Sequence, residues 1–219
     1  LDQKVKKIIA LSTDKASSPS NLYGATKLVS DKLFTAANSY TGDGDTIFSV
    51  VRYGNVLGSR GSVIPFFKSL DTNSPLPITH PEMTRFMITL RQAVDLVLIA
   101  LADMVGGEIY VKKIPSMKVT DLASALYPGR AQKVVGTRPG EKLHEQMIGV
   151  EDQDYTYEYE NYFKILPAIN FWHLDADRIK DGKKVGENFV YSSDNNDQWM
   201  SREELLKWLD ENNDGIGQR

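Results

Sequence analysis

The stretch KKIIALST, residues 6–13, contains the apolar run IIAL (8–11) and ends on two hydroxyl side chains. Runs of this kind predict a strand buried on both faces of a parallel sheet. Apolar residues then recur at helical spacing from Leu22 to about Tyr40, and TIFSVVRY, residues 46–53, predicts a second buried strand. A strand, a helix and a strand in this order form a parallel crossover unit, so the sequence predicts an α/β fold.

The elements expected after residue 62 are more mixed. Two capping-box patterns, TLRQ at 89–92 and SREE at 201–204, predict helices that run to about Met104 and Glu211. Residues 151–165 are acidic and rich in tyrosine, and we expect a loop followed by a strand there. The remaining expectations are helices over residues 63–70, 119–126 and 141–148, and strands over residues 108–112 and 132–137.

Composition narrows the class of protein. The chain has 219 residues, of which 41% are hydrophobic and 25% charged, as in ordinary soluble globular domains. A formal charge of −3 argues against a dedicated nucleic-acid partner, and no apolar run approaches the ~20 residues that cross a bilayer. The chain has no cysteine, which excludes disulfides and zinc–thiolate sites, and its histidines lack metal-ligand spacing. We expect a cytoplasmic protein with no metal, no membrane segment and no secretory leader.

Polar residues that follow the first strand are candidates for chemistry. Thr13 ends the strand and Asp14 and Lys15 come next, so they belong to the edge where open α/β sheets bind ligands. Tyr23 and Lys27 are four residues apart and therefore share one helix face, where an ammonium favours the phenolate form of a tyrosine. The alternative is a surface Asp14–Lys15 salt bridge with helix-capping neighbours. A Tyr-x-x-x-Lys pair also arises by chance on many helices.

The motifs that carry these residues are similar to a known family. They are LSTDKA (11–16), NLYGATK (21–27), RYGNVLGSRGSV (52–63), MTRF (83–86), KIPSM (113–117), RPGEKLHE (138–145) and NNDQW (195–199). Together they resemble the extended short-chain dehydrogenase/reductase superfamily and, more narrowly, the inverting UDP-N-acetylglucosamine 4,6-dehydratases of pseudaminic acid biosynthesis. Tyr23 stands where larger membrane-attached dehydratases carry Met, and Lys15 stands where retaining dehydratases carry Glu.

The resemblance implies a reaction and a role for each residue of the first cluster. NADP (NAD is not excluded) takes a hydride from sugar carbon 4 and later returns it to carbon 6. Tyr23 matches the base for the carbon 4 hydroxyl, Lys27 assists it and contacts the cofactor with it, and Thr13 hydrogen-bonds nearby. Lys15 matches the base for the carbon 5 proton, and Asp14 matches the acid that protonates the departing carbon 6 hydroxyl.

The same resemblance implies a substrate site. Asn55 would bind the sugar nucleotide, Val56 would line the cofactor, and Glu141 would accept a hydrogen bond from the uridine ribose. Guanidinium groups suit phosphate oxygens, so the diphosphate would be contacted by Arg60, Arg85 and Arg138. Arg60 has the alternative of a solvated loop charge, and Glu141 that of a helix cap. The glycines at 54, 58 and 61 follow a strand as phosphate-binding glycines do, but without G-x-G-x-x-G spacing.

The glycine-rich dinucleotide motif itself is absent from the sequence. We expect roughly 100 upstream residues, about one mononucleotide-binding half of a Rossmann fold, to be missing. Residues 1–62 would then be the C-terminal part of a doubly wound, Rossmann-type NADP-binding domain. Residues 63–219 would be mainly a smaller α/β nucleotide-sugar-binding region, with some segments returning to the first domain. Loss of upstream strands would expose a sheet edge, which favours aggregation or dependence on a partner.

Three functions stay open at this point. The first is an inverting UDP-N-acetylglucosamine 4,6-dehydratase, a lyase that would be a homo-oligomer at full length and would serve surface-sugar or flagellin glycosylation. The second is a retaining dehydratase or a nucleotide-sugar 4-epimerase, which needs Tyr23 and Lys27 but, if an epimerase, no acid–base pair at 14 and 15. The third is a non-catalytic nucleotide-sugar-binding fragment.

Overall fold

The computed structural model describes residues 3–42, 44–169 and 174–212. The chain divides into two compact units that each use three segments. Unit 1 comprises Leu1–Tyr53, Arg91–Lys113 and Gln146–Tyr191. Unit 2 comprises Gly54–Leu90, Ile114–Glu145 and Ser192–Arg219.

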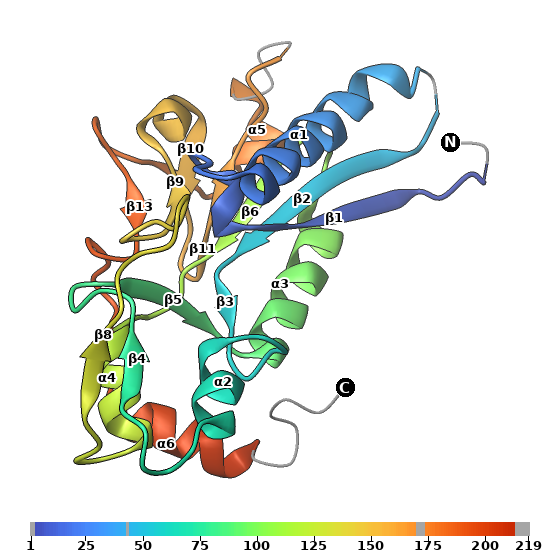
Figure 1. Ribbon diagram of the computed structural model, residues 1–219. Helices are drawn as coiled ribbons and strands as arrows, with labels where there is room; N and C mark the ends of the chain where they lie inside the picture. Colours follow the sequence, from blue (N-terminus) through green and yellow to red (C-terminus); the bar gives the residue numbers. More distant parts are fainter. Residues whose placement is uncertain (1–2, 43, 170–173, 213–219) are drawn as a thin grey trace. The chain divides into compact units, whose positions relative to one another are not determined.

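Unit 1 is built on a six-stranded sheet with the strand order β1-β2-β6-β11-β10-β12 (Figure 1). β1, β2 and β6 run parallel, and β11, β10 and β12 follow in antiparallel pairing. β1 is the end strand of this sheet among the described residues, so the expected open sheet edge is present. The strands are β1 (Lys7–Thr13), β2 (Ile47–Tyr53), β6 (Ile109–Lys112), β10 (Thr156–Glu158), β11 (Tyr162–Ile165) and β12 (Lys183–Lys184).

Two long helices cover opposite faces of the parallel strands. α1 (Leu22–Ala37) joins β1 to β2, which confirms the predicted crossover, and α3 (Leu90–Asp103) precedes β6. Val51 packs with α3 residues, whereas the next side chain, Arg52, bonds to Asp31 of α1. Neighbouring strand residues point to opposite faces of the sheet, so successive side chains of β2 contact α3 on one face and α1 on the other. The remaining elements are η1 (Asp14–Ala16), η2 (Asn38–Tyr40), η3 (Val150–Tyr155) and α5 (Ala176–Ile179).

A buried ion-pair cluster joins α3 to the antiparallel part of the unit 1 sheet. Lys164 of β11 is only 1% exposed, and its Nζ donates to Asp103 Oδ2 at 2.7 Å. The Tyr110 hydroxyl donates to the same oxygen at 2.7 Å, and Lys180 pairs with the other oxygen. Burial alone would raise the pKa of Asp103, but the hydrogen bonds from Lys164, Lys180 and Tyr110 outweigh it and lower that pKa.

We expect Asp103→Asn to destabilise the protein by about 3–5 kcal/mol at pH 7, because it leaves the Lys164 cation buried without its counter-charge. A carboxyl with a lowered folded-state pKa stabilises above its unfolded pKa of about 3.9, and this stabilisation is lost as the pH falls through the folded value. Urea unfolding at pH 7 and at acidic pH should therefore show the gap between wild type and variant closing on acidification. Asp95→Asn, an exposed site on the same helix, is the control; equal stability of the two variants would contradict this reading.

Within its described residues, unit 2 has a small mixed sheet, a two-stranded parallel ribbon and three helices. The sheet order is β3-β5-β7, and the ribbon pairs β4 with β8. Its core gathers apolar side chains from α2, β4, β5, α4 and α6, with Phe67, Leu122 and Leu205 almost fully buried. The elements are β3 (Asn55–Val56), α2 (Val63–Ser69), β4 (Leu76–Ile78), β5 (Thr84–Ile88), β7 (Ser116–Lys118), α4 (Val119–Leu126), β8 (Gln132–Val134) and α6 (Arg202–Glu211).

Several predicted elements are confirmed, and two expectations are wrong here: one predicted helix is absent, and β1 is not buried on both faces, because Leu11 is 52% exposed on this end strand of the sheet. α2, α4 and α6 occur where expected, and the capping box at Ser201 and Glu204 is formed. The helix predicted over residues 141–148 is absent: residues 141–145 are irregular and β9 (Gln146–Ile148) follows, pairing with β13 (Tyr191–Ser192). The Arg85 guanidinium donates hydrogen bonds to the carbonyls of Lys142 and Leu143, which would be backbone acceptors in a helix.

The acidic stretch also differs from expectation. Residues 150–155 form the short helix η3, and β10 and β11 make a hairpin where one strand was predicted. β8 is shorter than the predicted strand over 132–137 and ends at Val134. No helix within the described ranges has the length and apolarity needed to cross a membrane.

Candidate active site

The carboxyl end of β1 carries a compact group of polar side chains. The chain turns directly from β1 into η1, with Thr13 as the capping residue. The Thr13 hydroxyl donates to Asp14 Oδ1 at 2.8 Å and accepts from the Lys15 backbone N–H at 3.4 Å. Lys15 Nζ donates to the same Asp14 oxygen at 3.0 Å. The structure therefore brings Thr13, Asp14 and Lys15 into one hydrogen-bonded cluster.

Burial distinguishes the acid from the amine in this cluster. The Asp14 side chain has no exposed surface, whereas that of Lys15 is 31% exposed. Asp14 Oδ2 is buried and has no hydrogen-bond partner among the described residues. Buried carboxyl oxygens are normally paired, and exceptions occur at catalytic positions. The Asp14–Lys15 ion pair and the capping neighbours of the alternative interpretation are both present, but the Asp14 side chain is buried and not at the surface.

The first turns of α1 present the tyrosine and the lysine. Asn21 caps the helix by accepting from the Gly24 N–H at 2.9 Å, which places Tyr23 and Lys27 on successive turns. Lys27 Nζ donates to the Leu11 carbonyl of β1 at 3.1 Å, and the Tyr23 side chain is about half exposed. One ammonium hydrogen is used by β1, so two remain for a phenolate or a ligand hydroxyl.

Tyr53, at the end of β2, is a neighbour that the sequence analysis did not identify. Its backbone pairs with Thr13 across the parallel strands. Burial raises the pKa of Tyr53, and the adjacent Tyr23 phenol raises it further. Tyr53 therefore stays protonated at neutral pH and can donate a hydrogen bond but not serve as the base. A tyrosine that ends a strand paired with the Thr13 strand is the sequence signal that could have found it.

Gly24 lets α1 approach η1 closely. A Cβ at this position would lie 2.3 Å from the Lys15 carbonyl oxygen and 3.0 Å from the Pro19 Cβ. Both η1 and the start of α1 are therefore held at a spacing that only glycine permits. The backbone of Lys15, and hence the position of its amine, depends on this contact.

We expect Gly24→Ala to displace η1 and to destabilise unit 1 by about 1–3 kcal/mol, the range for overpacking. This loss should appear although alanine favours a helix over glycine by about 1 kcal/mol. Urea unfolding is the measurement. Gly186→Ala is the matched control, because nothing lies within 4 Å of a Cβ built there. A Gly24→Ala protein as stable as the control would show that the close approach is not required.

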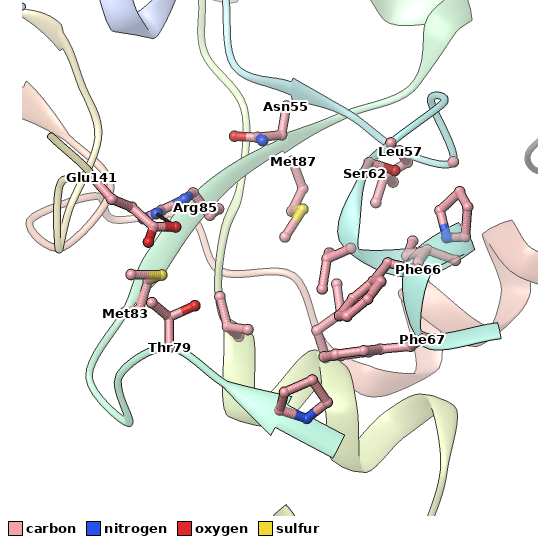
Figure 2. A pocket seen from close by; sticks show the side chains of 18 of the residues that line it. Asn55, Leu57, Ser62, Phe66, Phe67, Thr79, Met83, Arg85, Met87 and Glu141 are labelled. Carbon is pink, nitrogen blue, oxygen red and sulfur yellow. Dashed lines mark ion pairs between the residues drawn. The ribbon is translucent and has the colours of Figure 1, made fainter. Parts of the chain in front are cut away.

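Unit 2 contains a cavity of about 590 Å³. Figure 2 shows Phe66 and Phe67 on one side of it and Asn55, Arg85 and Glu141 on the other. Asn55 Oδ1 and Ser62 Oγ are buried and have no hydrogen-bond partner among the described residues. The cavity thus combines an apolar wall with a few polar groups, as small-molecule sites do.

The three arginines expected to bind the diphosphate differ in their exposure and in their hydrogen bonds. Arg85 is nearly buried, and its guanidinium donates to the carbonyls of Thr84, Lys142 and Leu143 at 2.7–3.1 Å. It also lies 3.5 Å from Glu141 Oε1. Most of its donors are thus used by the protein, which suits a residue that shapes the wall of the cavity.

Arg138 and Arg60 are both exposed, but only Arg138 lines the cavity. Glu141 Oε2 accepts from the Arg138 backbone N–H at 3.1 Å, so part of its role is to hold the turn of residues 138–141. Asn55 and Val56 both line the cavity.

The three glycines that follow β2 have structural reasons to be glycine. A Cβ built on Gly54 would lie 2.4 Å from the Phe86 Cβ. Gly58 and Gly61 have a φ of +71°, which side chains disfavour. Close packing and backbone conformation therefore explain these glycines without a bound phosphate.

The parallel strands, the Tyr-x-x-x-Lys pair on the crossover helix and the acid–amine pair at the strand end define a Rossmann-type protein of the short-chain dehydrogenase/reductase class. Residues 1–167 match the family described as polysaccharide biosynthesis protein, and the chain belongs to that family. Among the residues that the structure describes, no group of His, Asp or Glu side chains is arranged to hold a metal ion.

Named relatives agree with this family. The chain is 56% identical over 210 residues to a UDP-N-acetylglucosamine 4,6-dehydratase (inverting) of Campylobacter jejuni, covering 93% of this chain and 63% of the relative. It is 41% identical over 214 residues to a UDP-glucose 4-epimerase of Rickettsia akari, covering 95% of this chain and 62% of that protein. The chain therefore spans less than two thirds of the length of these relatives.

Solved structures share the fold. The structure of Pen from Bacillus thuringiensis superposes with a TM-score of 0.82 at 33% identity, covering 98% of this chain and 64% of that chain. The hexosamine 5,6-dehydratase TunA gives a TM-score of 0.55 at 17% identity, covering 96% of this chain and 65% of that one. These matches confirm the predicted Rossmann-type α/β fold.

Proposed function

We propose that this chain is the catalytic and sugar-nucleotide-binding part of a C5-inverting UDP-N-acetylglucosamine 4,6-dehydratase, a lyase that forms a 4-keto-6-deoxy UDP-sugar. The observation that carries the proposal is the Thr13–Asp14–Lys15 cluster at the end of β1 and the start of η1, together with the Tyr23–Lys27 pair on α1, whose Lys27 bonds to β1. An epimerase needs the tyrosine and the lysine alone. The acid–amine pair supplies the two groups that elimination of water requires, and the 56% identity to a dehydratase supports the same choice.

The residues of unit 1 would divide the reaction between them. Tyr23 removes the proton of the carbon 4 hydroxyl, with Lys27 stabilising the phenolate. Once carbon 4 is a ketone the carbon 5 proton is acidic, and Lys15 removes it as a neutral amine, after its ammonium proton has passed to Asp14 or to solvent. Asp14 protonates the departing carbon 6 hydroxyl, and a carboxyl with one buried, unpartnered oxygen suits that role. Reprotonation of carbon 5 from the opposite face gives inversion.

The site fits a nicotinamide dinucleotide, and we propose NADP. Tyr23 is half exposed at the strand ends, and Lys27 has ammonium hydrogens left for ribose hydroxyls, so these two residues would hold the nicotinamide riboside. Val56, which lines the cavity of unit 2, is proposed as a further cofactor contact. When bound, the dinucleotide supplies the acceptor and then the donor of the hydride.

The cavity of unit 2 is proposed to take the UDP part of the substrate. Asn55 has an unpartnered oxygen for a sugar or base N–H or O–H, and Glu141 suits a ribose hydroxyl. Arg138 is the cation on the cavity wall that is exposed to solvent. Arg85 would act indirectly by holding residues 141–143, and Arg60 has no place in the cavity wall.

We expect Arg138→Ala to weaken UDP binding by about 1.5–3 kcal/mol, the range for a hydrogen bond to a charged group, without loss of stability. Arg85→Met should lower stability as well as affinity, because it releases the carbonyls of Lys142 and Leu143. Calorimetric titration with UDP, together with urea unfolding, separates the two effects. Arg60→Ala is the control and should bind as wild type does. Normal binding by Arg138→Ala would remove this residue from the site.

The test of the function is a proton NMR time course with UDP-N-acetylglucosamine and NADP⁺. It compares this chain with the full-length product that contains it. A new methyl doublet and an inverted carbon 5 would support the proposal. Retention at carbon 5 would indicate a retaining dehydratase, and a change at carbon 4 alone an epimerase. Absence of product from folded full-length protein would overturn the proposal and favour a binding role.

We further propose that the product enters pseudaminic acid biosynthesis for surface-sugar or flagellin glycosylation, in the cytoplasm, by a full-length homo-oligomer. Sedimentation of the full-length protein tests the oligomeric state. Conversion of the product by an aminotransferase acting on the 4-keto group tests the direction of the pathway.

A further inference from the structure

A buried ion cluster lies behind the catalytic groups of unit 1, on the α1 side of the sheet. Arg52 of β2 is 2% exposed, and its backbone pairs with Ser12, one residue before Thr13. Its Nη2 lies 3.0 Å from Asp31 Oδ2, and its Nη1 donates to the Met147 carbonyl at 2.6 Å. Asp152 Oδ2 is 3.8 Å from the same Nη1. One guanidinium therefore joins β2 to α1, β9 and η3.

Of the three elements that Arg52 holds, α1 and β9 contact η1, and η3 contacts the residue just after Ser17, the C-cap of η1. Asp31 lies on α1 one turn beyond Lys27 and two turns beyond Tyr23, so an anchor at Asp31 sets the rotation and height of the face that carries both. η1, which carries Asp14 and Lys15, contacts α1 on one side and β9 on the other. The Ser18 hydroxyl, just after η1, donates to Glu151 of η3 at 3.4 Å.

We propose that Arg52, together with Asp31, is a positioning residue that sets the spacing between the Tyr23–Lys27 pair and the Asp14–Lys15 pair. Neither residue reaches the reacting atoms; both act through the elements that carry the catalytic side chains. This inference rests on the proposed dehydratase reaction, because that reaction uses the two pairs in sequence on adjacent carbons of one sugar. All the residues and contacts that support the inference lie within unit 1.

The choice of arginine follows from the number of acceptors. A planar guanidinium can donate to Asp31 and to the Met147 carbonyl at the same time in a fixed geometry, whereas a lysine ammonium is a point charge on a flexible stem. Asp31 is the stronger partner, because it is nearer. Asp152 is the weaker ion-pair partner, because its Oδ2 lies 3.8 Å from the guanidinium. Burial raises the pKa of Asp152, although the Arg52 and Lys32 charges oppose this effect.

The test uses the full-length product with three variants: Arg52→Gln, Arg52→Lys and Asp31→Asn. We expect Arg52→Gln to lower kcat about 100-fold, the loss that a displacement of about 1 Å produces, with a much smaller change in KM. Arg52→Lys should recover part of the activity, because it keeps the charge but not the fork. Arg178→Lys is the matched control: Arg178 is also a buried arginine of unit 1, but it bonds to Gly106 and Asp175.

Hydrogen exchange supplies a readout that does not depend on activity. Arg52→Gln and Asp31→Asn should speed exchange in residues 14–17, 22–31 and 146–150, and Arg178→Lys should not. A kcat per folded molecule equal to wild type, or exchange that rises evenly over unit 1, would overturn the proposal. If Arg52→Gln does not fold, Asp31→Asn gives the answer. A wild-type protein that forms no dehydrated sugar would defeat the proposed function, and the exchange pattern would still decide whether Arg52 holds the two pairs.

Discussion

Tyr23→Phe is expected to lower the rate of 4-keto-6-deoxy sugar formation by about 10²–10⁴-fold, the contribution of a positioned general base. The phenol oxygen is the group proposed to take the carbon 4 hydroxyl proton, and Phe lacks it. Stability should not change, because the side chain is about half exposed. The loss should appear in kcat, since the proposed contacts to the nucleotide lie in the cavity of unit 2.

The measurement is the NMR time course on full-length protein, with urea unfolding of the same sample. Tyr40→Phe is the matched control, because Tyr40 is 78% exposed and lies in η2. Tyr53→Phe should lose less than Tyr23→Phe, because a partly buried phenol with a raised pKa can donate a hydrogen bond but not act as the base. A Tyr23→Phe enzyme within a few-fold of wild type would show that another group is the base.

Asp14→Asn is expected to lower product formation by a similar factor of about 10²–10⁴, because an amide cannot protonate the departing hydroxyl. It should not stop the earlier steps. Tyr23 can still assist oxidation at carbon 4, and Lys15 can still remove the carbon 5 proton. In deuterated water, substrate recovered from the Asp14→Asn enzyme should therefore carry deuterium at carbon 5.

Lys15→Met provides the contrast to this result. It removes the base, so it should abolish both product formation and deuterium uptake into recovered substrate. Proton NMR of the recovered sugar nucleotide measures both. Uptake with Lys15→Met and none with Asp14→Asn would reverse the two roles. Normal turnover by both variants would remove this cluster from the chemistry.

Local sequence determined the crossover unit and the spacing of its chemical groups. The apolar run before Thr13 and the helical period after Leu22 are nearest-neighbour patterns, and burial of one face is enough to form them. A separation of four residues places Tyr23 and Lys27 on one face of any helix. The cap at Ser201 is local for the same reason, since its partner Glu204 is three residues away.

Tertiary contacts decided what local pattern could not. Residues 141–148 have a helical pattern, yet the Arg85 guanidinium takes the carbonyls of Lys142 and Leu143 and the segment stays irregular. The same contacts distinguish Arg85, whose donors are used by the protein, from Arg138, which is exposed, although both are arginines in family motifs. A buried guanidinium must satisfy its donors with whatever acceptors the fold brings near, and those acceptors lie 57 and 58 residues away along the chain.

The cluster around Arg52 has the same origin. Its partners Asp31 and Met147 lie 21 and 95 residues away along the chain. No sequence period relates them, because they meet only when β2, α1 and β9 pack together. The sequence by itself therefore predicted which side chains carry the proposed chemistry. Only the tertiary structure decided which charged groups stay available for a ligand and which are used to hold the elements in place, because that depends on where each buried donor finds its acceptor.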